Sequence, residues 1–163
     1  MIAHRLLLLL VLLSACRHSD RWAYNQIESG DKQFNSTKLS HHTSDLVNGL
    51  DLEFMRIAGE IRTYLNIHSL PIPSSKEDPK TTSGFLTIGS EKHPFQAFRH
   101  EGGQRLLLPK EISELIIQAL SDNLPVHIKV FGYSSTITAE GFEPKFQKMM
   151  KDSHLQNPFH LPF

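Results

Sequence analysis

The sequence predicts an α+β fold in which a small antiparallel sheet, with elements in the order βββαββα, packs on a central helix. An amphipathic helix and a polar tether are expected in front of it. Three observations predict this fold. Short alternating segments joined by glycine-containing turns lie between residues 84 and 108, a helical period follows, and strict alternation returns at residues 126–131. Strands joined by short turns pair antiparallel, and a helix between them covers one face of the sheet.

The first 16 residues have the layout of a secretory signal peptide. Arg5 supplies a positive start, residues 6–13 are an unbroken apolar run, and small residues follow. A permanent transmembrane helix needs about 20 apolar residues, so this run is too short to be one. We therefore expect this segment to be a signal peptide that is removed from the mature protein.

The signal segment ends in Leu13-Ser14-Ala15-Cys16, which resembles the lipobox of bacterial lipoproteins at every position. The resemblance implies that the Cys16 thiol receives a diacylglyceryl group and that lipoprotein signal peptidase cuts between Ala15 and Cys16. Acyl chains would then hold the protein at a membrane, stably where there are two or more. Arg17, rather than aspartate, follows the cysteine, which favours the outer membrane over the inner one in diderm bacteria. The alternative is a lone cysteine after an ordinary signal peptide.

Residues 16–43 are expected to be the lipidated cysteine and a flexible polar tether, because their apolar residues fit neither a helical nor a strand period. As a flexible coil the tether would reach on the order of 30 Å. An alternative places Trp22 and Tyr24 at the lipid headgroups, where amphipathic aromatic rings are favoured.

Residues 44–67 are expected to form an amphipathic helix that Ser44 caps, although Gly49 and Gly59 would weaken it. Apolar residues recur there at spacings of three and four: Val47, Leu50, Phe54, Ile57, Ile61 and Tyr64. Such a stripe faces a core or, alternatively, forms the seam of a homodimer. Pro71, Pro73 and Pro79 then predict a linker over residues 68–83.

Residues 84–152 are the expected α+β domain. Its first three strands are expected at 85–88, 94–100 and 105–108, with a hairpin turn at Gly102-Gly103. Pro109 suits the first position of the helix that follows.

The core face of that helix is formed by Ile112, Leu115, Ile116, Ala119 and Leu120. Asn123 can close it in a left-handed conformation. Alternation predicts strands at 126–131 and 136–138, and Phe142, Phe146 and Met149 or Met150 mark a last helix over residues 142–151.

The C-terminal residues 153–163 contain two prolines, and Phe159, Leu161 and Phe163 alternate there. This tail is expected either to be frayed or to dock in a groove.

The totals exclude several classes of function. Lys+Arg 17 balance Asp+Glu 17, so no basic field favours nucleic acid and no acidic field favours calcium. Cys16 is the only cysteine, and its lipidation would exclude disulfides, thiolate catalysis and cysteine-based zinc sites.

No catalytic or metal-binding pattern is evident among the remaining residues. His41 and His42 are adjacent and diverge, and His93 and His100 would lie on opposite faces of one strand, so no three ligands converge and no metal or other cofactor is expected. Gly132-Tyr133-Ser134-Ser135-Thr136 lacks the last glycine of a nucleophile elbow. Four carboxylates are considered for hydrolysis, and each is expected to be a solvated or stabilising charge at the edge or the end of a helix: Glu53, Glu60, Glu140 and Glu143.

These observations predict a lipid-anchored protein of the bacterial cell envelope that is not an enzyme and that binds or helps assemble another envelope protein. The alternative is an anchored hydrolase whose catalytic residues converge only in three dimensions. The expected partners are membrane lipid, through the Cys16 acyl chains, and another envelope protein.

Overall fold

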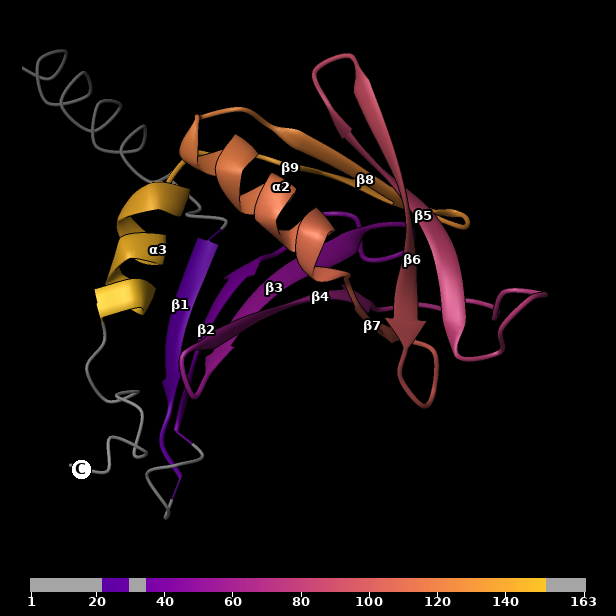
Figure 1. The fold of residues 1–163 in the computed structure, drawn as a ribbon, viewed down its shortest axis with the longest axis horizontal. Coiled ribbons are helices and arrows are strands. Elements are labelled where there is room, and N and C mark those ends of the chain that lie inside the picture. The colour runs from indigo at the N-terminus through magenta and orange to yellow at the C-terminus, as the bar shows by residue number, and fades with distance from the viewer. Residues whose placement is uncertain (1–21, 30–34, 152–163) are drawn as a thin grey trace, which may run out of the picture.

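The computed structural model describes residues 22–29 and 35–151, which form one nine-stranded antiparallel sheet and two helices (Figure 1). Across the sheet the strand order is β1-β2-β3-β4-β7-β6-β5-β8-β9. The elements are β1 (Trp22–Ile27), β2 (Ser36–His41), β3 (Leu50–Ile57), β4 (Glu60–Ile67), β5 (Thr81–Ile88), β6 (Glu91–Arg99), β7 (Arg105–Leu107), α2 (Lys110–Ser121), β8 (Val126–Val130), β9 (Tyr133–Ile137) and α3 (Phe142–Lys151).

The short strand β7 joins two arms of the sheet. It pairs with β4 at residues 64–66 and with β6 only at Phe98 and Arg99. Strands β1 to β4 form one arm, and β5, β6, β8 and β9 form the other. Figure 1 shows the two arms diverging, with α2 between them and α3 beside β1.

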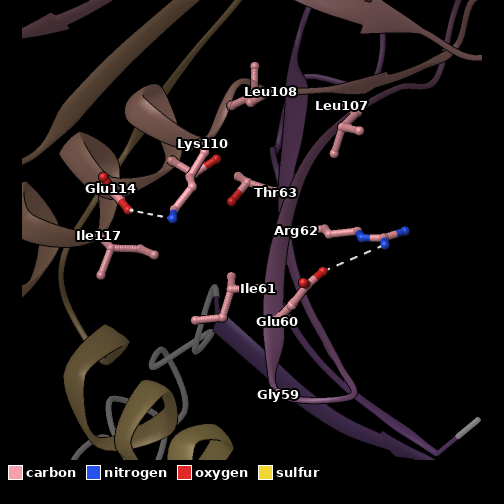
Figure 2. A pocket seen from close by; sticks show the side chains of 11 residues that line it. Gly59, Glu60, Ile61, Arg62, Thr63, Leu107, Leu108, Lys110, Glu114 and Ile117 are labelled. Atoms are coloured by element: carbon pink, nitrogen blue, oxygen red, sulfur yellow. Dashed lines mark ion pairs between the residues drawn. The ribbon is translucent and has the colours of Figure 1, made fainter.

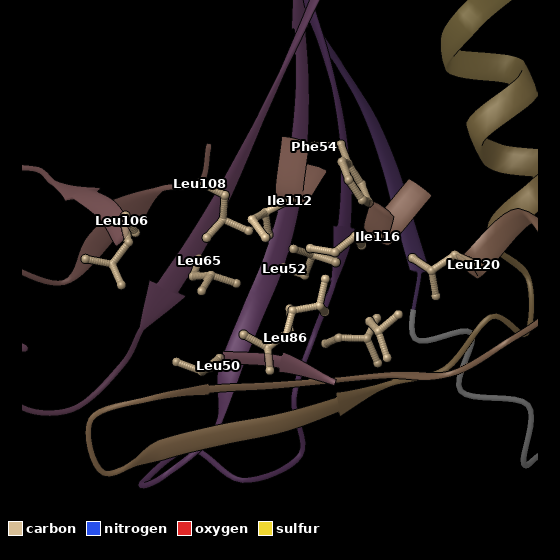
Figure 3. Close-up of a cluster of buried hydrophobic side chains, with 14 of the residues drawn as sticks. Leu50, Leu52, Phe54, Leu65, Leu86, Leu106, Leu108, Ile112, Ile116 and Leu120 are labelled. Carbon is tan, nitrogen blue, oxygen red and sulfur yellow. The ribbon is translucent and has the colours of Figure 1, made fainter. Parts of the chain in front are cut away.

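The hydrophobic core fills the space between the arms and the two helices. Figure 3 shows side chains of β3, β4 and α2 pointing toward one another. The fully or nearly fully buried side chains include Leu50, Leu52, Phe54, Leu65, Leu86, Ile112, Ile116, Leu120, Ile128 and Phe142. Burying each such side chain contributes about 1.5–3 kcal/mol, so this shared core is what holds the two arms to one another.

The arms are also tied where β3 begins. The Leu50 N–H donates to the Ser135 hydroxyl at 2.7 Å, and the Ser134 N–H donates to the Asn48 carbonyl at 2.9 Å. These bonds bring the last strand of the sheet against the start of β3, so the sheet curves around its core.

The expected fold class is wrong: the chain forms one large antiparallel sheet rather than a small βββαββα sheet packed on a central helix. The expected helix over residues 44–67 is instead the β3–β4 hairpin, which turns at Ala58 and Gly59 with φ angles of 50° and 86°. The stretch that shows a helical spacing also contains a two-residue alternation, Leu50, Leu52 and Phe54. These three side chains are fully buried in the core, and their burial favours the strand over the helix.

The stripe expected as a dimer seam does not form as a continuous surface. Val47 lies in the loop before β3. Phe54 packs in the core, whereas Tyr64 lies on the outer face of β4 beside Arg105.

The polar segment expected to be a tether contributes β1 and β2 to the sheet. Leu39 is completely buried, and Trp22 is 1% exposed and packs on Phe54 and Phe142, so the Trp22 ring is not available to lipid headgroups. Strands β1 and β2 are held in the sheet because Trp22 and Leu39 bury their side chains in the core, which their polar neighbours in the sequence conceal.

The remaining strands and helices lie near their expected positions, but they belong to the larger sheet. Residues 68–80 contain no strand or helix, yet Ile72 is fully buried and its carbonyl accepts a bond of 2.7 Å from Arg99 Nε. The expected linker is therefore packed on the sheet. Within the described residues, neither helix is long and apolar enough to span a bilayer.

Candidate functional site

A groove of about 590 Å³ lies between β4 and the exposed side of α2 (Figure 2). It is lined by Gly59, Glu60, Ile61, Arg62, Thr63, Leu107, Leu108, Lys110, Ser113, Glu114 and Ile117.

The groove exists because β7 leaves the edge of β4 early. The Leu108 N–H donates to the Thr63 carbonyl at 2.9 Å, and the chain then turns at Pro109 into α2. Among the described residues, no segment pairs with residues 60–62 on this side of β4. An edge of the sheet is therefore open at the bottom of the groove.

The backbone of Ile61 faces this open edge. On the side of β4 away from β3, the Thr63 carbonyl accepts the Leu108 N–H, and the Ile67 N–H donates to the Gln104 carbonyl. Backbone groups alternate in direction along a strand, so Ile61, which is two residues before Thr63, presents its N–H and C=O to the groove. These are the groups that an additional strand would use.

The walls of the groove are largely apolar. Ile61 of β4 and Ile117 of α2 are half-buried and border the same space from its two sides in Figure 2. Leu108 contributes its side chain near the start of the helix. An apolar ligand could therefore bury its surface against both elements.

The charges at the rim balance. Lys110 and Glu114 form an i,i+4 ion pair of 3.8 Å on α2, and Arg62 and Glu60 form one of 3.8 Å on β4. All four side chains are more than half exposed, and exposed pairs of this kind contribute little to stability. Two cations against two carboxylates favour a neutral ligand over a strongly charged one.

One buried polar group in the groove lacks a partner. The Thr63 hydroxyl is completely buried and makes no hydrogen bond, whereas the Ser113 hydroxyl nearby donates to the Pro109 carbonyl at 2.9 Å. Figure 2 shows the Thr63 side chain extending from β4 toward α2. An unsatisfied buried hydroxyl of this kind costs about 1–3 kcal/mol.

The outer face of the same arm carries a cluster of ion pairs. Glu53, which is 5% exposed, accepts a hydrogen bond from Arg105 and lies 3.5 Å from Lys38 Nζ. The Arg105 guanidinium also lies 4.0 Å from the centroid of the Tyr64 ring. These contacts link β2, β3, β4 and β7, so we assign Glu53 a structural role.

A second carboxylate on this face is held by two histidines. Asp51 Oδ2 lies 2.8 Å from His42 Nδ1 and 2.9 Å from His68 Nε2, while Oδ1 accepts the Thr43 N–H at 2.8 Å. Burial raises the pKa of the Asp51 carboxyl, but the hydrogen bonds from Thr43, His42 and His68 together outweigh it, so this pKa lies below its ordinary value. The cluster fastens the loop after β2 to the start of β3.

The histidines considered as ligands do not converge. His41 packs edge-on against Trp22 in the core, whereas His42 points outward to Asp51. His93 lies 3.6 Å from Glu91, and His100 contacts Phe98. No group of three or more His, Cys, Asp or Glu side chains that could hold a metal ion occurs in residues 22–29 and 35–151.

The serine and carboxylate candidates are also separate. Ser134 and Ser135 lie in β9, and the Ser135 hydroxyl is used by the Leu50 N–H. Glu53 lies in the outer cluster, whereas Glu60 lies opposite Ile57 at the other end of β3 and borders the groove.

The other two carboxylates considered for hydrolysis lie near α3. Glu140 lies in the turn before this helix. Glu143 lies at its start and accepts hydrogen bonds from Ser121 and Gln147.

Sequence reasoning missed Ile61, Thr63 and Ile117 as site residues. The signal that could have indicated them is Pro109, which ends β7 after three residues and so leaves the neighbouring edge open. Ala15 and Cys16, together with the C-terminal residues 153–163, lie outside the described residues. Comparison with protein-family models, with curated proteins and with solved structures finds no match for this chain.

Proposed function

We propose that this chain is a lipid-anchored protein of the bacterial cell envelope, placed at the outer membrane where there are two membranes. In this proposal it is not an enzyme, and it binds an extended, alternately apolar segment of another envelope protein in the groove beside β4. The proposal for the anchor is supported by the lipobox-like sequence that ends at Cys16.

The observation that carries the binding proposal is the open edge of β4 inside an apolar groove. An extended peptide that adds to a sheet edge gains main-chain hydrogen bonds, and its alternate side chains enter the pocket. Here the Ile61 backbone would supply the bonds, and the Ile61 and Ile117 side chains would contact the inward residues of the peptide. The balanced rim fits a peptide without strong net charge.

The charge environment favours a binding protein over the alternative of a hydrolase. A general acid at neutral pH needs a carboxyl whose pKa is raised. Surroundings lower the pKa of Asp45, mainly through the backbone N–H groups of Asn48 and Val47, and they also lower that of Asp51. Both carboxyls lie outside the groove. The carboxylates of the groove itself, Glu60 and Glu114, are more than half exposed and do not converge, since each is paired with a cation of its own element.

The anchor is tested by labelling cells with a fatty-acid probe. We expect the wild-type protein to carry the label and to begin at Cys16 by mass spectrometry, and Cys16→Ala to lose both features. Ser14→Thr, which changes a neighbouring residue but keeps the thiol, is the control and should remain labelled. A native polypeptide that retains Met1 and a free thiol would contradict the anchor.

The groove is tested with a synthetic, end-capped peptide of alternating Leu and Thr and the full mature chain carrying Cys16→Ser. Titration should shift the NMR signals of the Ile61 and Thr63 amides. Ile117→Lys should weaken binding by about tenfold or more, because it places a charge against an apolar ligand. Phe131→Lys changes a residue that is 66% exposed and outside the groove, and it should leave binding unchanged. Equal weakening by both variants, or no shift at Ile61, would contradict the proposal.

A further inference from the structure

We infer that the face of β5, β6, β8 and β9 that points away from the core docks on the anionic phospholipid headgroups of the membrane that holds the Cys16 acyl chains. The inference rests on the lipid anchor of the proposed function. It concerns the arm of the sheet that contributes no residue to the groove beside β4, so the two binding surfaces are separate.

The four strands expose one common face. Phe85 of β5 lies opposite Pro94 of β6 and Lys129 of β8, and Lys129 lies opposite Ser134 of β9. Directly opposed residues share a face of the sheet, and so do residues two apart along a strand. The outward face therefore consists of every second residue of each strand, in register with Phe85. The intervening residues, such as Leu86, are buried in the core, and α2 lies between the two arms of the sheet (Figure 1).

The charge on the outward face is not balanced. It carries Lys92 and Lys129, together with His127, and its other side chains are threonine, serine, glutamine, proline and phenylalanine. Glu91 is the only carboxylate in these four strands, and it lies opposite Ile88, in the set of residues that alternates with the outward face. Cations without a neighbouring carboxylate attract an anionic partner, although the chain as a whole is neutral.

The outward face also exposes aromatic rings beside its cations. The side chains of Phe85 and Phe98 are 40% and 44% exposed. Lys92 Nζ lies 3.9 Å from the centroid of the Phe85 ring. At a lipid surface such rings bury themselves at the boundary of the acyl chains, while the ammonium groups stay among the phosphates. A layer of anionic headgroups therefore suits both kinds of side chain.

The position of the anchor favours a membrane over a soluble polyanion. Trp22 follows Cys16 by six residues, and a chain of that length spans no more than about 20 Å. Trp22 Nε1–H donates to the carbonyl of Thr138, which directly follows β9. The acylated sulfur is thus kept close to one border of the outward face. At such a high local concentration, two lysines are enough to hold the face on an anionic leaflet, although each strengthens binding only about fivefold.

Vesicle binding tests the charge requirement in the full mature chain carrying Cys16→Ser. We expect this chain to sediment with vesicles of equal parts phosphatidylcholine and phosphatidylglycerol more than with vesicles of phosphatidylcholine alone. Adding Lys92→Gln and Lys129→Gln should lower its partition coefficient on the anionic vesicles by roughly 20-fold, since each lysine contributes about fivefold.

The matched control is the same chain with Lys110→Gln and Lys151→Gln. It loses the same charge, but from α2 and α3, whose apolar sides pack against the core. We expect it to bind the anionic vesicles like the chain with Cys16→Ser alone. Equal losses in the two double variants, or no preference for phosphatidylglycerol, would overturn the inference.

Fluorescence quenching tests which side of the molecule meets the lipid. In the same chain, Phe98→Trp places an indole on the outward face, and Ile117→Trp places one on α2 in the groove. The native Trp22 is 1% exposed and gives a constant background. Brominated acyl chains in the anionic vesicles should quench Phe98→Trp and leave Ile117→Trp unquenched. Quenching of Ile117→Trp as strong as that of Phe98→Trp would overturn the inference.

Two further outcomes separate this inference from its alternatives. Binding of a single-stranded oligothymidylate without binding of the anionic vesicles would overturn it, because the face would then fit a nucleic acid. The vesicle experiment uses a chain without the anchor, so a native protein that lacks the fatty-acid label would contradict the anchor while lysine-dependent vesicle binding left the face standing. A labelled native protein whose Cys16→Ser chain ignores anionic vesicles would overturn this inference alone.

Discussion

The indole Nε1–H of Trp22 donates a hydrogen bond to the carbonyl of Thr138 at 2.9 Å. Trp22 begins β1, and Thr138 directly follows β9, so this bond joins the segments at the two outer edges of the sheet order. The ring is 1% exposed and also packs on Phe54 and Phe142. Trp22 therefore closes the curved sheet over the aromatic core beneath α3.

We expect Trp22→Phe to lower the free energy of unfolding by about 1–3 kcal/mol, because the Thr138 carbonyl loses its donor while an aromatic ring remains in the core. Circular dichroism in urea should report the change, since Trp22 is the only tryptophan and its fluorescence is lost. Ile27→Ala, at a residue of the same strand that is 42% exposed, should stay within about 0.5 kcal/mol of the wild type. Similar losses in the two variants would mean that the indole bond does not carry the effect.

Asp51 should make stability depend on pH. Its pKa is lowered in the folded state, so its stabilisation is present above the unfolded-state value of about 3.9 and is lost as the pH falls through the folded value. Asp51→Asn removes the charge but keeps the size. We expect it to lower the free energy of unfolding by about 1.5–3 kcal/mol at neutral pH, and the gap to the wild type should close on acidification.

Urea unfolding of both proteins at about pH 7 and about pH 3 measures this dependence. Glu91→Gln serves as the control, because Glu91 is 77% exposed and has only a long contact of 3.6 Å to His93. A gap between the wild type and Asp51→Asn that stayed constant across this range would show that the carboxylate charge is not the source of the stabilisation.

Gly84 should tolerate no side chain. A Cβ at this position in β5 would lie 2.5 Å from the Phe95 ring and 2.9 Å from the Lys129 carbonyl, so β5 would be forced away from both neighbouring strands. We expect Gly84→Ala to cost about 1–3 kcal/mol in unfolding free energy, as overpacking of a core does.

Gly132→Ala is the matched substitution. A Cβ there would meet no atom within 4 Å, and the residue does not have a positive φ. It should be neutral or stabilise by up to about 1 kcal/mol, because alanine restricts the unfolded chain. Thermal unfolding of Gly84→Ala and Gly132→Ala measures this difference. Equal shifts of the two unfolding midpoints would contradict the packing argument.

Short-range signals account for the parts of the chain that could be predicted. Alternation marks β8 at residues 126–130, and Pro109 precedes α2. Gly102 and Gly103, with φ angles of 84° and 68°, form the turn between β6 and β7. Each of these signals is complete within a few residues and needs no knowledge of distant partners.

The parts that could not be predicted depend on distant partners. Asp51 and Glu53 look like the polar face of a helix, yet in β3 they are nearly buried because His42, His68, Lys38 and Arg105 come from other segments to pair with them. The groove likewise results from where β7 stops beside β4, which is a relation between two segments about forty residues apart. The alternation of β3 and β4 was present in the sequence but was masked by a helical spacing in the same residues.

The turn that distinguishes these two readings can be tested at Ala58. Ala58 has a φ of 50° and Gly59 one of 86°, so both central residues of the β3–β4 turn are left-handed, as a type I′ hairpin requires. Alanine is strained in this region by roughly 1 kcal/mol, whereas asparagine adopts it readily. Ala58→Asn should therefore raise the free energy of unfolding by up to about 1 kcal/mol in urea, and Ala58→Val, with its branched side chain, should lower it. In a helix over residues 44–67 both substitutions would lower the free energy of unfolding, because asparagine and valine are poorer helix formers than alanine, so a gain with Ala58→Asn distinguishes the hairpin from the helix.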